Sequence, residues 1–141
     1  MLVGTCDAAH VPECTRAVGL LIHDDRATAT VYLPEVTSAL AMVHLRENMR
    51  IAVVASYPLD HRSLQLKGRV TAIAPAVAAQ RPFIERYLEA FSGVLEQVGM
   101  PPEVVRLLSH WPSVAVTFAV DELYDQTPGP GAGARLLGLA T

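Results

Sequence analysis

Three polar side chains stand at alternate positions of the stretch SLQLKGRVTAI, which covers residues 63–73. Apolar residues between them give the stretch the period of two that is typical of a β-strand, so Gln65, Lys67 and Arg69 are expected on one face. Two cations beside an amide could hold a phosphate or the polar edge of a heterocycle. The ordinary alternative is a solvated outer strand face, where alternating polar residues need no ligand.

Arg16 and the pair Thr37 and Ser38 are further candidates for anion binding. Arg16 lies in the expected strand CTRAVGLLI (14–22), whose other residues carry no charge, and an arginine there costs free energy unless it has a partner. It could pair with an acidic residue earlier in the chain, or it could be an anion ligand. Thr37 and Ser38 stand at the expected start of a helix, whose free N–H groups often hold phosphate. Either residue could equally be a simple N-cap.

The composition argues against several other kinds of site and partner. The formal net charge is −3, so no basic footprint for nucleic acid is expected. No apolar run is long enough to cross a bilayer and the first ten residues do not resemble a signal sequence, so no membrane contact and a cytoplasmic location are expected. The five histidines lack the spacing of a helical metal site, and no GxSxG motif occurs, so neither a metal nor a serine nucleophile is predicted.

The elements that would position these residues follow from the hydrophobic pattern. Strands are expected at 2–6, 14–22, 27–33, 51–57, 63–73 and 114–124, with a helix at 35–48 and a helical segment from 80 to 110. Val36, Leu40 and Val43 can share one face of the first helix, and Gly68 suggests a bulge or a close backbone approach. Short loops between the first three strands indicate antiparallel pairing. Hydrophobic residues make up 51% of 141, which predicts one domain with a thick core and a buried subunit interface.

Taken together, TRAVG, the turn VTS, LRENMRIAVV and QLKGR resemble the pyridoxamine 5′-phosphate oxidase-like family of FMN-binding split barrels. The resemblance covers residues 2–75 best, and the run QTPGPGAG (126–133) is similar to the ending of one subgroup. It implies a mainly β fold: a six-stranded antiparallel split β-barrel of Greek-key type, with an inserted helix and a helical segment before the last strand. The chain 1–141 would be one domain. Two copies would form a homodimer with FMN at their interface, and 126–133 could cross over the partner or form a disordered tail.

The resemblance also implies which residues hold the cofactor. The expected set is Arg16, Thr37 and Ser38 toward the FMN phosphate, Ala17 and Val18 along the ring, and Gln65 and Lys67 at polar edges of the flavin or its ribityl chain. One position departs from the family pattern, because Ala41 stands where many members carry a lysine that binds the phosphate. Arg16, Lys67 or Arg50 would have to supply that charge.

The function implied by the resemblance is that of a flavin-dependent oxidoreductase with a small-molecule substrate. The cofactor would carry the hydride chemistry, so no catalytic acid or base is required of the chain. The missing lysine motivates an alternative, a non-catalytic binder of flavin, haem or deazaflavin. A further alternative is a dimeric module without a cofactor.

Overall fold

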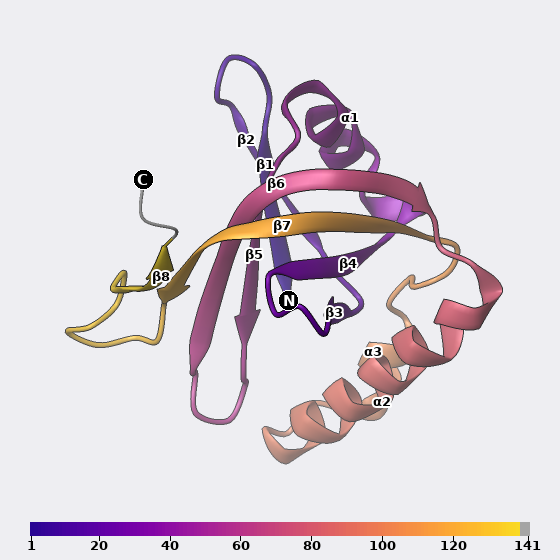
Figure 1. Ribbon diagram of the computed structural model, residues 1–141. Coiled ribbons are helices and arrows are strands. Elements are labelled where there is room, and N and C mark those ends of the chain that lie inside the picture. The colour runs from indigo at the N-terminus through magenta and orange to yellow at the C-terminus, as the bar shows by residue number, and fades with distance from the viewer. Residues whose placement is uncertain (139–141) are drawn as a thin grey trace.

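In the part of the chain that the structure describes, eight strands form one antiparallel sheet, and the helices lie outside it (Figure 1). The structure, a computed structural model, describes residues 1–138. The strands are β1 (Leu2–Cys6), β2 (Pro12–Arg16), β3 (Leu20–Ile22), β4 (Thr28–Pro34), β5 (Arg50–Ser56), β6 (Ser63–Pro75), β7 (Ser113–Asp125) and β8 (Arg135–Gly138). The helices are α1 (Ala39–Asn48), α2 (Arg81–Gln97) and α3 (Pro102–Arg106), with 3-10 turns η1 (Glu35–Thr37) and η2 (Ala78–Gln80).

The sheet curls into an open barrel whose strand order is β2-β1-β5-β6-β7-β4-β3, with β8 added to β7. Its two end strands are consecutive in the chain. They are separated at residues 17–19, where the backbone stops pairing with β1 and begins to pair with β4. The Val18 N–H donates a hydrogen bond to the Tyr32 carbonyl at 2.9 Å. The mainly β, antiparallel split barrel is therefore confirmed, but the predicted count of six strands is wrong. The expected strand 14–22 is two strands, and β8 was not predicted.

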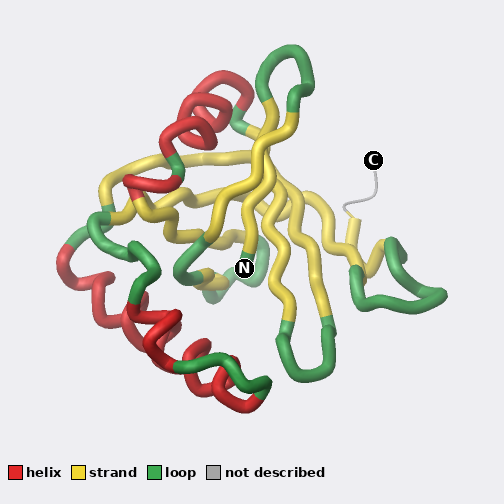
Figure 2. Tube along the Cα trace, turned by 180° about the vertical axis from the view of Figure 1, so that it is seen from behind, coloured by secondary structure: helices red, strands yellow, loops and turns green. Residues whose placement is uncertain are grey.

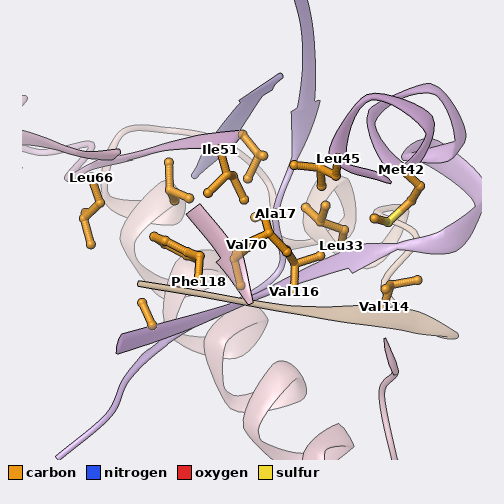
Figure 3. Close-up of a cluster of buried hydrophobic side chains, with 14 residues drawn as sticks. Ala17, Leu33, Met42, Leu45, Ile51, Leu66, Val70, Val114, Val116 and Phe118 are labelled. Carbon is orange, nitrogen blue, oxygen red and sulfur yellow. The ribbon is translucent and has the colours of Figure 1, made fainter. Parts of the chain in front are cut away.

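The core fills the inside of the barrel (Figure 3). Strands contribute Leu33, Ile51, Val116 and Phe118, among others, and α1 adds Met42 and Leu45 over one opening. A smaller cluster lies under α2, which buries Ile84 against Val18, Tyr32 and Ala115. Within residues 1–138, no helix is long and apolar enough to span a membrane.

The apolar stripe predicted for the first helix lies on its exposed side. Val36, Leu40 and Val43 are 74%, 52% and 47% exposed, respectively. The buried side instead carries Ala41 and Leu45, which are 1% and 0% exposed. The helix is thus attached to the barrel by a face that the spacing of the larger apolar residues did not indicate.

Gly68 marks a β-bulge, as its place in the strand pattern predicted. The pairing of β6 with β7 shifts between Lys67, which faces Glu122, and Gly68, which faces Val120, so Asp121 is an extra residue on β7. A Cβ atom on Gly68 would lie 1.9 Å from the Ala119 carbonyl oxygen. Only glycine allows the two backbones to approach this closely.

The Pro and Gly run 126–133 forms a hydrogen-bonded turn between β7 and β8. The Gly133 N–H donates to the Asp125 carbonyl at 2.7 Å, and the Asp125 N–H donates to the Ala134 carbonyl at 2.9 Å. Gly129 and Gly133 have φ angles of +154° and +86°, which residues with a Cβ rarely adopt. A contact of this turn with a partner subunit stays a prediction.

Gly68→Ala should destabilise the protein, since the added methyl group meets backbone that cannot move aside. We expect the free energy of unfolding to fall by about 1–3 kcal/mol, the usual effect of overpacking. Urea unfolding followed by circular dichroism measures it. Gly93→Ala is the matched control, because nothing lies within 4 Å of that Cβ and alanine is favoured inside a helix. Equal stability of Gly68→Ala and the wild type would contradict the close contact.

Candidate cofactor site

Two rows of side chains cross the outer face of the sheet. Because side chains alternate along a strand, the neighbours of the inward-facing Val3, Val53 and Leu66 must point outward. Strand register aligns them as follows: Arg16, Leu2, Val54, Gln65 and Tyr124 form the first row, and Cys14, Gly4, Ala52, Lys67 and Glu122 form the second. The sheet therefore brings Arg16, Gln65 and Lys67 to one surface, as a shared ligand would require.

The middle of the second row is made of small residues. Gly4 and Ala52 lie side by side on β1 and β5 and leave a hollow of about 290 Å³. Its lining includes the cations Arg50 and Lys67 and also the acidic residues Asp121 and Glu122. A flat backbone floor with charged groups of both signs beside it suits a planar, polar molecule.

A charged cluster borders this hollow on β6, β7 and β8. The Lys67 ammonium lies 4.8 Å from the centre of the Tyr124 ring, within the range of a cation–π contact. The Tyr124 hydroxyl donates a hydrogen bond to the Glu122 carboxylate. This hydrogen bond lowers the pKa of Glu122, assisted by Arg135 and Lys67, and it raises the pKa of Tyr124. The carboxylate and the phenol are therefore both favoured in the folded protein at neutral pH.

Arg16 is the first residue of the first row and Gln65 is the fourth. β1 and β5 separate their strands, so the two backbones are roughly 14 Å apart at the usual strand spacing. Arg16 is exposed, and it forms no ion pair with any residue of 1–138. The Gln65 side chain accepts a hydrogen bond from Gln126 at 3.2 Å. A single ligand that touches both residues must be elongated.

The outer face does not include every predicted residue. Arg69 is on it but lies 3.7 Å from Asp121, so its charge is partly compensated. Ala17 and Val18 are 1% and 0% exposed and belong to the two core clusters. A contact between these two residues and a flavin ring would have to be made by their backbone, and it stays a prediction.

Thr37 and Ser38 lie on the inner side of β2. The Thr37 carbonyl accepts a hydrogen bond from the buried Thr15 hydroxyl at 3.0 Å, which holds η1 against that strand. Ser38 is 1% exposed and its hydroxyl donates to the Pro34 carbonyl at 2.6 Å, so it neither caps α1 through its side chain nor faces solvent. Thr37 is exposed and remains the member of the pair that could meet a phosphate.

Ala41 lies where the family lysine was expected, on the buried side of α1. Its side chain does not face solvent, and the exposed residues of the first turns of α1 are the apolar Leu40 and Val43, not a cation.

Within residues 1–138, no group of three or more His, Cys, Asp or Glu side chains could hold a metal ion.

Three residues of this cluster were not predicted from the sequence: Glu122, Tyr124 and Arg135. The alternation in DELYD does contain the signal, because Leu123 separates two polar residues in a strand. Only the bulge at Asp121 determines that Leu123 faces the core and the other two face outward. Arg135 lies on β8, which was not predicted.

Comparison with known proteins gives similarity in structure alone, since no protein-family model and no curated protein sequence matches the chain. HupZ of Group A Streptococcus aligns with a TM-score of 0.55 and 17% identity over 94% of this chain and 88% of that one. An FMN-binding protein of Syntrophomonas wolfei aligns with a TM-score of 0.51 and 9% identity, over 88% of this chain and 74% of that one. A Clostridium acetobutylicum protein related to general stress protein 26, of the pyridoxinephosphate oxidase family, aligns with a TM-score of 0.50 and 16% identity, over 90% of this chain and 78% of that one. The predicted split-barrel fold is confirmed. At sequence identities of 9–17%, the similarity to these structures shows a shared fold and nothing more.

Replacing Tyr124 with Phe should raise the pKa of Glu122 toward its ordinary value, because the hydrogen bond that favours the carboxylate is lost. The stabilisation that this bond gives is present above the pKa of the unfolded carboxyl group and disappears as the pH falls through the folded value. NMR titration of the Glu122 side-chain carbonyl carbon measures the midpoint. Tyr57→Phe is the control. An unchanged midpoint in Tyr124→Phe would show that the hydroxyl does not act on Glu122.

Proposed function

We propose that this protein is an FMN-binding flavoprotein that holds the cofactor on the outer face of its sheet, between two copies of the chain. The observation that carries the proposal is the alignment of Arg16, Gln65 and Lys67 along that face, around a floor of small residues. The same fold occurs in an FMN-binding protein, which supports the assignment.

The residues of the outer face fit the shape and charge of FMN. The hollow over Gly4 and Ala52 would accept a flat ring, and Lys67 in its lining offers a donor to polar ring edges. Gln65, the next outward residue of β6 toward the first row, offers a second donor. Glu122 lies beside Lys67, which makes that end unfavourable for a phosphate. Arg16, which has no such neighbour in its row, is therefore the better phosphate ligand, at a distance that an elongated cofactor can span.

The small volume and exposed position of this site support the proposed dimer. A hollow of about 290 Å³ is at the small end for a cofactor site, and such sites bury most of their ligand. A second copy that covers the outer face would enclose the ring and exclude water. Bound FMN would supply hydride chemistry toward a small-molecule substrate, and the chain would bind and orient it.

The buried Ala41 favours a second candidate function, a flavin-type binder without turnover. Because Ala41 stands where a lysine would bind the phosphate, the affinity for FMN would depend more strongly on Arg16. Bleaching of the flavin absorbance by reduced nicotinamide would support the oxidoreductase. Retention of an oxidised flavin under the same conditions would support the binder.

Arg16→Ala should weaken FMN binding at least about tenfold, the usual scale for losing a charge-assisted contact to phosphate. Quenching of FMN fluorescence on titration with protein gives the dissociation constant. Arg86→Ala removes an exposed cation of α2 and should leave binding unchanged. If FMN does not bind the wild-type protein, or if both variants bind it equally well, the proposed site is wrong.

A further inference from the structure

A second and larger cavity lies at one end of the barrel, between the β5–β6 hairpin and α2. Figures 1 and 2 show the tip of that hairpin and α2 at the same end of the molecule. The cavity has a volume of about 550 Å³, which is in the range of small-molecule sites. Most of its lining is apolar, with walls formed by Ala55, Tyr57, Leu64, Tyr87, Phe91 and Val94.

The cavity exists because the hairpin extends beyond the packed core. Leu66 closes the core and is 8% exposed, whereas Leu64, one step further on the same face of β6, is 42% exposed. On the opposite side, α2 is anchored near its start by the fully buried Ile84. Further along the helix, the rings of Tyr87 and Phe91 stack with centroids 5.9 Å apart and form one wall. The two surfaces face each other across space that the chain does not fill.

Apart from the Met1 amino group, whose pKa burial lowers, and the hydroxyls of Tyr57 and Tyr87, the polar groups around the cavity are already paired within the chain. The Ser63 hydroxyl lies 2.7 Å from that of Ser56, the Asp125 carboxylate accepts the Thr127 N–H at 2.8 Å, and Arg62 contacts Asp60. Recognition by charge is therefore weak, and contact with apolar and ring surfaces dominates.

Tyr87 offers the cavity a polar contact. Its hydroxyl accepts a long hydrogen bond from the amino group of Met1 at 3.4 Å, which leaves its own proton for another acceptor. Burial raises the pKa of Tyr87, so the hydroxyl is a donor at neutral pH. A ligand oxygen near this ring would be a suitable acceptor.

We propose that this cavity is a binding site for an uncharged, planar ring compound that carries a carbonyl or similar acceptor oxygen. The ring lies between Leu64 of the hairpin and the Tyr87–Phe91 wall, and the oxygen accepts from Tyr87. The site goes beyond the proposed FMN site and is separate from it, because Leu64 and Gln65 are adjacent in β6 and point to opposite faces of the sheet.

Binding of 2-acetylnaphthalene, an uncharged aromatic ketone, tests the proposal by its fluorescence or by calorimetry. We expect saturable binding to the full chain, with 2-ethylnaphthalene about fivefold weaker because it lacks the acceptor oxygen. Tyr87→Phe should remove this difference between the two compounds. Ala90→Phe places a ring in the cavity and should weaken the ketone at least about tenfold, whereas Ser92→Phe, which lines the groove on the other side of α2, should not.

Controls separate this site from the FMN site and from an interface. Lys67→Ala should leave binding of the ketone unchanged, whatever its effect on FMN, because Lys67 lines the hollow of the outer face and not this cavity. The two proposals can therefore fail independently. Absence of saturable binding to the wild type would overturn the proposal. It would also be overturned if Ala90→Phe and Ser92→Phe weakened the ketone equally. Conversion of a dimer to a monomer by Ala90→Phe, with no ketone bound by the wild type, would show that a second copy covers the cavity.

Discussion

The outer face of this protein depends on one extra residue in β7. Phe118 and Val120 face the core at even positions, but Asp121 is inserted opposite the Lys67–Gly68 step and reverses the alternation. Leu123 therefore faces inward, and Glu122 and Tyr124 face outward. Without the insertion, a carboxylate and a phenol would point into an apolar core, at a cost that the fold could not offset.

The bulge links packing to the proposed chemistry. It places Glu122 and Tyr124 in register with Lys67 and Gln65, so the charged cluster and the small-residue floor form one continuous surface. The same β6 strand then carries Leu64 on its other face, toward α2. A single long hairpin thus separates two different environments: a polar, open surface for the proposed flavin, and an aromatic cavity for the proposed ring compound.

Local pattern was sufficient to predict most of the elements, and the ones it missed depend on tertiary context. The alternation of SLQLKGR predicted both β6 and its polar outer face, and Gly68 indicated the bulge. The interruption at residues 17–19 was not predictable, because the apolar run continues while the chain changes partner from β1 to β4. β8 is short and follows a Gly-rich turn, so its pattern is too brief to recognise.

The site was predictable only in part for the same reason. Arg16, Gln65 and Lys67 lie on exposed strand positions that alternation identifies. Ser38 is buried by contacts of α1 with β-strands distant in sequence, which no local pattern reports.

The most direct test of the proposed FMN site is a map of amide chemical-shift changes in ¹⁵N-labelled protein on addition of FMN. FMN bound on the outer face should cause the largest changes at Gly4, Ala52 and Lys67. Changes confined to α2, or none, would contradict it.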